Sequence, residues 1–291
     1  MSKNYLKNAV INSYNNYKKK GLYQRAQPFI LNNPPLTPKK LLVVGVALGG
    51  KEEINSLNKY FPKYDIYGID VVKEALNQEI SNATLIYSDI AKLKFKNNYF
   101  SGILCSAVMH EVYSYSQQKE KRVKKAISEA SRCLTKNGVF VIREFYVPEE
   151  FPAKIIFKTE KAKEFSKKFI QNFRKELDPE LKNNYTINKN GISGNISILY
   201  EIMLHFRVME AHYKTFEKLL ESKEIEERYT AIQPSRYLQF LSQYNLHLIQ
   251  LNYIDFPHYT SIIKKHFKIL NKNGNEIYPK FGFIDIISRK I

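Results

Sequence analysis

The sequence lacks the features that mark secreted, membrane-spanning and metal-binding proteins. Its 291 residues include two cysteines, Cys105 and Cys133, which excludes a disulfide framework and favours a reducing compartment. No apolar run approaches the roughly 20 residues that a membrane span needs, and the first residues resemble neither a signal peptide nor a mitochondrial presequence. There is no C-x-x-C or H-E-x-x-H motif, and the six histidines are scattered. We therefore expect a cytoplasmic protein with no membrane span and no metal site.

Acidic residues are scarce beside basic ones. The chain has 28 Asp and Glu against 46 Lys and Arg, a formal net charge of +18. Such a charge is typical of proteins that bind RNA, DNA or another polyanion through a basic surface. A compositional bias that raises Lys, Asn, Ile and Tyr together is the alternative, and it explains the excess of lysine over arginine better than the shortage of acids. Both interpretations stay open.

The stretch from Leu41 to Gly50 is the one around which the rest of the chain is organised. Four apolar residues run into a glycine-rich bend, and a helical pattern opens at Lys51. This pattern predicts a buried parallel strand, a tight turn and a helix start, a unit that lets backbone approach a ligand closely. The next two predicted strands end in acids, at Asp70 and Asp89.

The glycine loop and the two acids together predict a crevice of adenosine size at the carboxyl edge of the sheet. An acid about twenty residues beyond such a loop is placed to accept hydrogen bonds from ribose hydroxyls, which is the role expected of Asp70. Asp89, after the following strand, is expected to meet the exocyclic amine of an adenine. Val71 and Ile90 are the expected apolar covers of the ring.

The chemistry of the loop distinguishes between adenosine cofactors. A diphosphate requires the pattern G-x-G-x-x-G and a helix N-terminus that is free to receive it. Here Glu52 and Glu53 occupy the first helical turn and would repel a diphosphate. They would tolerate S-adenosyl-L-methionine, which carries an ammonium and a sulfonium group. The loop residues expected to lie against its methionine end are Gly45, Ala47, Gly49 and Gly50.

Over residues 39–146, and again from 234 to the end, the chain resembles the class I S-adenosylmethionine-dependent methyltransferases. The segments similar to the family's successive motifs are Val43–Gly50, Gly68–Asp70, Ser88–Ile90, Phe100–Glu111 and Glu129–Arg143. More narrowly, residues 106–115 with 142–144 resemble a little-described bacterial and phage group. Three positions depart from the family pattern: Val43 and Ser101 stand where the family has acids, and Ala47 replaces a loop glycine.

The resemblance implies an α/β, Rossmann-like fold, a seven-stranded and mostly parallel sheet with helices on both faces. The alternation of strand and helix patterns from residue 40 to 146 independently predicts a parallel sheet covered on both faces. The expected strands are 41–46, 65–70, 84–88, 101–106, 138–145, 247–255 and 281–290. Helices are expected at 117–134 and from residue 234.

Three parts are expected along the chain. Residues 1–38 form an N-terminal helical extension, with a helix over 3–20, and residues 39–147 and 234–291 form the Rossmann-like domain. Residues 148–233 form a helical insertion between strands five and six, with helices at 153–177, 196–209 and 213–222 and a polar loop at 182–195. The resemblance would make this insertion a cap over the acceptor. The lysine-rich first helix is either a phosphate-binding face or a solvated surface.

Catalysis in such an enzyme requires alignment of two reactants and exclusion of water, with a base only if the acceptor must lose a proton. Ser106, His110 and Glu111 follow strand four, where the family faces cofactor and acceptor; Ser106 is assigned to the cofactor. His110 is the candidate base, and Glu111 and Glu144 are candidates for binding an acceptor amine or taking a proton. The alternatives are structural: a histidine that caps the strand end, and glutamates paired with Arg143 or another basic residue.

The leading hypothesis is therefore an S-adenosylmethionine-dependent methyltransferase acting on an N or O acceptor, with RNA or another nucleic acid favoured by the charge. A small-molecule acceptor under a helical lid is the second hypothesis. The three departures from the family pattern leave a third, a catalytically silent methyltransferase-like subunit that binds a partner.

Overall fold

The computed structural model describes residues 21–47, 50–77, 80, 82–173, 185–222, 224–278 and 280–291. The predicted helix over 3–20 and the predicted cofactor residue Gly49 lie outside these ranges. By their contacts the described residues form two compact units. The Rossmann-like unit comprises the described residues from Gly21 to Glu144, with Ser235–Tyr253 and Ile284–Ile291. The insertion unit comprises the described residues of Phe145–Pro234 and Ile254–Phe283. None of the described helices is long and apolar enough to cross a bilayer.

A seven-stranded sheet with the order β3-β2-β1-β4-β5-β11-β9 forms the centre of the Rossmann-like unit. Its strands are β1 (Lys40–Val44), β2 (Asp65–Asp70), β3 (Ala83–Tyr87), β4 (Phe100–Ser106), β5 (Leu134–Phe145), β9 (Leu246–Asp255) and β11 (Gly282–Lys290). The five strands from β3 to β5 pair in parallel. The predicted Rossmann-like, mostly parallel sheet is thus confirmed.

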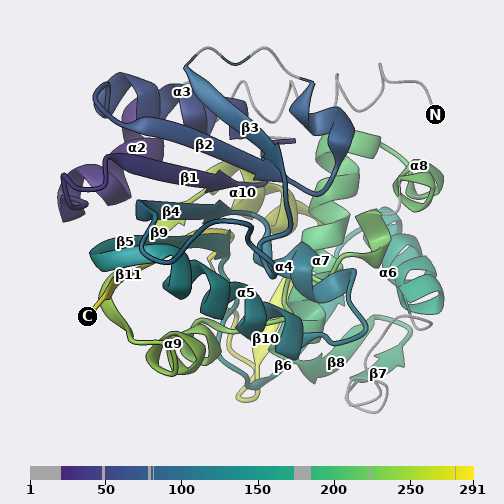
Figure 1. The fold of residues 1–291 in the computed structure, drawn as a ribbon. Helices are drawn as coiled ribbons and strands as arrows, with labels where there is room; N and C mark the ends of the chain where they lie inside the picture. The colour runs from purple at the N-terminus through teal and green to yellow at the C-terminus, as the bar shows by residue number, and fades with distance from the viewer. Residues whose placement is uncertain are drawn as a thin grey trace. The chain divides into compact units, whose positions relative to one another are not determined.

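Helices cover both faces of this sheet (Figure 1). They are α2 (Gly21–Asn32), α3 (Gly50–Tyr60), the 3-10 turn η1 (Lys73–Leu76), α4 (Met109–Ser114), α5 (Glu120–Cys133) and α9 (Pro234–Ser242). Phe29 of α2 and Ile54 of α3 share one core with Val43 of β1. The apolar face of α5, at Val123, Ala126, Ile127 and Ala130, is buried as its helical spacing predicts.

The run of apolar residues in β1 explains why this strand lies in the middle of the sheet. Residues Leu41 to Val44 are all buried, and alternate side chains of a strand point to opposite faces. A strand with apolar residues on both faces must be covered on both, which a parallel sheet between two helical layers provides. Its carboxyl end is therefore fixed between the ends of β2 and β4, which pair with it.

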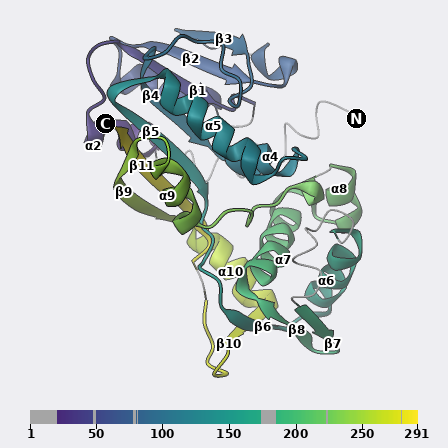
Figure 2. The same cartoon turned by 60° about the horizontal axis from the view of Figure 1, so that its bottom comes forward.

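The insertion unit has its own antiparallel sheet with the order β10-β6-β8-β7 (Figure 2). The strands are β6 (Pro152–Phe157), β7 (Tyr185–Asn188), β8 (Gly191–Asn195) and β10 (Phe267–Asn271). The helical elements are α6 (Glu160–Phe173), α7 (Ile196–Val208), the π-helical turn η3 (Met209–Tyr213), α8 (Phe216–Glu221), the 3-10 turn η4 (Glu224–Glu226) and α10 (Pro257–His266). Side chains of α6, α7 and the sheet form one apolar core.

The insertion differs from the purely helical segment that the sequence predicted. The predicted helix over 153–177 is wrong at its start, because residues 153–157 belong to strand β6 and α6 begins at Glu160. The predicted polar loop over 182–195 contains β7 and β8, and residues 174–184 of the two predictions lie outside the described residues. Gly191 is one physical reason, because a Cβ at this position would lie 2.0 Å from the carbonyl oxygen of Ile155. Glycine thus allows β8 to approach β6 closely. Residues 254–283, predicted as part of the Rossmann-like domain, group by their contacts with the insertion unit.

Candidate active site

The loop after β1 turns so tightly that it requires glycine. Gly45 has a φ of +79°, and an added Cβ would lie 2.4 Å from a methyl carbon of Val108. Its N–H donates to the carbonyl of Ile69, at 2.9 Å. At the start of α3, a Cβ on Gly50 would lie 2.8 Å from the carbonyl oxygen of Gly45. Glycine at both ends of the loop therefore permits this close packing, and contact of the loop with a ligand stays a prediction.

Asp70, the predicted ribose ligand, holds this loop in place. It is the last residue of β2 and is buried. Its Oδ2 accepts hydrogen bonds from the backbone N–H groups of Val46, at 2.9 Å, and Ala47, at 3.1 Å. Its Oδ1 accepts from the N–H of Val72, at 2.8 Å. A carboxylate offers about four acceptor positions, so three bonds leave one acceptor position for a ligand hydroxyl. The ligand role of Asp70 stays a prediction, and its contacts with the loop were not predicted from the sequence.

Asp89 lies at the neighbouring strand end. The N–H of Ser88 donates to the carbonyl oxygen of Asp70, at 3.1 Å, which joins the ends of β2 and β3. Asp89 Oδ1 accepts from the N–H of Ala91, at 2.8 Å, and Oδ2 is ion-paired with Arg122 of α5. The two acids that were expected to share an edge therefore do so. Arg122 is a contact that the sequence gave no signal for, because it is one of several basic residues on a solvated helix.

The apolar residues predicted as covers for an adenine ring differ in exposure. Ile90 is buried, whereas Val71 is 58% exposed. Two further apolar side chains in the same segments, Val72 and Tyr87, are also about half exposed, at 47% and 49%. Apolar side chains left in water at the strand ends favour contact with a flat ligand surface more than core packing.

A buried cluster of charges lies beside the end of β4. Ser106, predicted at the cofactor, donates from Oγ to Glu53 Oε1, at 3.3 Å. The same oxygen accepts from Arg25, at 3.3 Å, and from Arg143, at 3.2 Å. Arg143 also makes a bidentate pair with Asp285 of β11, at 2.7 and 3.0 Å. Both guanidinium groups thus have carboxylate partners, as charges in a protein interior require.

We call Arg25, Glu53, Arg143 and Asp285 the buried charge cluster. Its members are at most 4% exposed. The sequence suggested Glu111 or Glu144 as alternative partners for Arg143. It could not reveal Asp285, which is 142 positions away along the chain.

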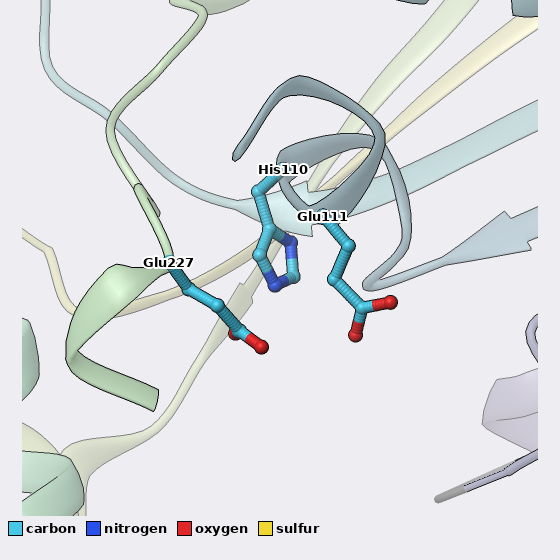
Figure 3. A group of neighbouring side chains, drawn as sticks. All are labelled: His110, Glu111 and Glu227. Atoms are coloured by element: carbon cyan, nitrogen blue, oxygen red, sulfur yellow. The ribbon is translucent and has the colours of Figure 1, made fainter. Parts of the chain in front are cut away.

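His110 and Glu144 form a second buried pair. Glu144, in β5, accepts at Oε1 from the N–H of Met109, at 2.6 Å, and thereby caps the first turn of α4. Its Oε2 lies 2.8 Å from His110 Nδ1. An imidazole that donates from Nδ1 to a carboxylate has Nε2 left as its acceptor. Glu111, the next residue, is half-buried, and its side chain projects from the same short helix (Figure 3). Glu227, also drawn there, belongs to the insertion unit.

Cys105 has no nucleophilic role in this site. It is fully buried in β4, and burial raises the pKa of its thiol well above the usual value, with the nearby Glu144 carboxylate adding to the rise. A thiol that stays protonated is a poor nucleophile. Burial likewise raises the pKa of Tyr237 on α9, again with Glu144 contributing.

Comparison with known proteins identifies the central part of the Rossmann-like unit. Residues 44–142 match the model of a family described as a methyltransferase domain. This stretch contains the last residue of β1, strands β2 to β4, the glycine loop, both acids and His110. The predicted resemblance to S-adenosylmethionine-dependent methyltransferases is thereby confirmed for this part of the chain, and with it S-adenosyl-L-methionine as the cofactor. No curated protein sequence matches the chain.

Solved structures share the fold at low sequence identity. A candidate methyltransferase from Bacillus halodurans C-125 is 12% identical, with a TM-score of 0.51 over 91% of this chain and 98% of its own. A SAM-dependent methyltransferase from Methanosarcina mazei is 15% identical, with a TM-score of 0.46 over 90% of this chain and 97% of its own. At 12% identity, the likeness to the Bacillus halodurans structure shows the fold alone. The Methanosarcina mazei structure has the lower TM-score and adds nothing to that conclusion.

Proposed function

We propose that the protein transfers a methyl group from S-adenosyl-L-methionine to an N or O acceptor, with His110 as the general base. The observation that carries this proposal is the buried 2.8 Å contact between His110 Nδ1 and Glu144. It occurs in the segment after β4, beside the end of β1 from which the glycine loop leads.

The residues at the strand ends fit the proposed cofactor. Gly45 and Gly50 let the loop pack closely against Val108 and against its own backbone, and Asp70 has an acceptor position left for a hydroxyl. The hydroxyl of Ser88, between the two acids, is buried without a hydrogen-bond partner among the described residues. When bound, the cofactor supplies a methyl group on a positively charged sulfur. The chain holds it through the loop backbone, Asp70, Ser106 and the apolar side chains near Asp89.

His110 and Glu144 prepare the acceptor side. Glu144 holds the imidazole in one orientation and favours the tautomer with the proton on Nδ1, so that Nε2 can accept a proton from a hydroxyl or amine. The negative carboxylate also stabilises the imidazolium that results from this transfer. Glu111 is placed one residue further to bind an acceptor amine.

We infer a nucleic acid as the acceptor, supported by the net charge of +18. The second candidate, a small molecule, is supported by the ion pairs on α6, since lysines already paired with carboxylates are less available to phosphates. The pairs are Lys161 with Glu210, Lys163 with Glu160, and Lys168 with Glu217. The predicted cap function of the insertion remains part of this proposal.

The test of the proposed function has two steps. Calorimetry with S-adenosylhomocysteine is expected to show one binding site, and absence of binding would favour the silent subunit. The protein is then incubated with methyl-labelled cofactor and either total RNA or a small-molecule extract. Label in the RNA supports the leading acceptor, label in the extract supports the second, and label in neither, from a protein that binds the cofactor, contradicts the catalytic proposal.

A further inference from the structure

Glu53 lies where the loop after β1 meets the end of β4. It belongs to the first turn of α3, which begins at Gly50, and its side chain is buried. The contact with Ser106 Oγ, at 3.3 Å, fixes the carboxylate beside the last residue of β4. In the sheet, β4 lies next to β1 on the side away from β2 and β3. Glu53 and Asp70 therefore stand on opposite sides of the loop.

The two oxygens of the Glu53 carboxylate have different surroundings. Oε1 accepts from Arg25, Arg143 and Ser106. Oε2 is shielded from solvent and has no hydrogen-bond partner among the described residues. A buried acceptor without a donor loses its hydrogen bonds to water and forms none within the protein. Such unsatisfied acceptors are rare in native proteins. The position of Oε2 thus indicates a donor that comes from a ligand.

The proposed cofactor has such a donor at the right end. If its adenosine is held at Asp70 and Asp89, the methionine part would reach across the loop toward β4, where Glu53 lies. That part carries an ammonium group with three N–H donors. The formal charges of the buried charge cluster, two guanidinium groups and two carboxylates, sum to zero, so the cluster does not repel a cation.

We propose that Glu53 Oε2 binds the α-ammonium group of S-adenosylmethionine and of its demethylated product. This inference rests on the proposed function. It gives Glu53 a role in positioning the cofactor. The same carboxylate that would repel a diphosphate then binds the methionine end of S-adenosylmethionine. Arg25 and Arg143 hold the other oxygen and thereby fix the direction in which Oε2 points.

Calorimetry with two probes tests this role. The probes are S-adenosylhomocysteine and its analogue without the amino group. We expect wild-type protein to bind the former at least tenfold more tightly, because a charge-assisted hydrogen bond to a buried carboxylate is lost with the amine. In Glu53→Gln this preference is expected to fall below threefold. Glu52→Gln, which removes the neighbouring acid of the same helical turn, is the matched control and keeps the wild-type preference.

The outcomes separate this inference from the proposed function. Equal binding of both probes by wild-type protein overturns the role of Glu53 and leaves cofactor binding intact. An undiminished preference in a folded Glu53→Gln variant overturns it as well. Binding of neither probe contradicts the proposed function itself. If thermal melting shows that Glu53→Gln does not fold, Glu53→Asp is used instead, because it keeps the charge and withdraws the oxygen. A reduced preference for S-adenosylhomocysteine in Glu53→Asp supports the inference, and an unchanged preference overturns it.

Discussion

At the scale of single residues, the site depends on carboxylates that each serve two purposes. Asp70 fastens the glycine loop through Val46 and Ala47 and keeps one acceptor position for a ligand. Glu144 caps α4 and orients His110. A residue with both a structural and a ligand-binding role makes a variant affect stability and binding together, so each variant needs a matched control.

Asp70→Asn is expected to weaken binding of S-adenosylhomocysteine at least tenfold. The amide has one acceptor oxygen instead of two, so one of the loop N–H groups or the ligand hydroxyl loses its partner, and an unsatisfied buried donor also costs about 1–3 kcal/mol of stability. Calorimetry and urea unfolding measure the two effects. Asp65→Asn, at the exposed opposite end of β2, is the control and changes neither. Undiminished affinity in Asp70→Asn would remove Asp70 from the ribose site.

His110→Gln is expected to slow methyl transfer about 100-fold or more, the usual contribution of a general base. The acceptor is the one identified by the labelling experiment. The affinity for S-adenosylhomocysteine should stay within twofold, because His110 is assigned to the acceptor and not to the cofactor. His258→Gln, at an exposed position of α10, serves as the control. A wild-type rate in His110→Gln would show that His110 is a structural cap.

At the scale of elements, the strands and helices of the Rossmann-like unit could be predicted to within a few residues. Long apolar strands and the amphipathic face of α5 carry strong periodic signals. The insertion could not be predicted as well, because β6, β7 and β8 are short and β6 pairs with two segments far along the chain, β8 and β10. The same limit applies to the residues of the site. Asp70, Asp89 and His110 lie at or just after the ends of core strands and could be predicted. The charged partners Arg25, Arg122 and Asp285 could not, because their positions depend on tertiary packing.

Gly45→Ala tests the tight loop as an element. The substitution forces a Cβ into a left-handed conformation, which costs about 1–2 kcal/mol, and brings it against Val108, which adds about 1–3 kcal/mol. Gly274 has nearly the same φ, +78°, with nothing within 4 Å of an added Cβ. Gly274→Ala therefore measures the conformational cost alone. We expect the melting temperature to fall further in Gly45→Ala than in Gly274→Ala, and cofactor binding to be lost only in Gly45→Ala. Equal drops in melting temperature would mean that Val108 does not confine the loop.

The junction of α10 and β10 is expected to weaken in acid. Burial lowers the pKa of His266 below its ordinary value; the carboxylate of Glu210 opposes this, and the nearby lysines, Lys265, Lys161 and Lys158, add to it. The unfolded chain therefore binds the proton more readily than the folded one. Stability from this group is complete above about pH 6.5 and declines as the pH falls below that value. Thermal melting from pH 7.5 to 5 should show a decline that His266→Gln reduces; identical profiles would contradict it.

At the scale of the whole molecule, charge is the property that points most directly to a partner. A net charge of +18 attracts polyanions whatever their nucleotide sequence. Such binding weakens steeply as the salt concentration rises, because it depends on the release of counterions. The ion pairs on α6 show that part of this charge is compensated within the insertion unit. The balance between the two decides whether RNA is the acceptor or merely a non-specific ligand.

RNA binding is expected to be measurable at low salt and to weaken at least tenfold between 50 and 200 mM salt. Fluorescence polarisation with labelled RNA measures this. Lys161→Gln should change the affinity little, because its ammonium is already paired with Glu210. Lys154→Gln, on β6 and without an ion pair to any described residue, is the comparison. Absence of RNA binding at low salt would favour the small-molecule acceptor.

The most direct test of the central claim is a crystal structure with S-adenosylhomocysteine. We expect the adenosyl group across the carboxyl ends of β1, β2 and β3, with the ribose at Asp70 and the base beside Val71 and Asp89. Ligand bound anywhere else, or Asp70 and Asp89 without contact to it, would contradict the claim.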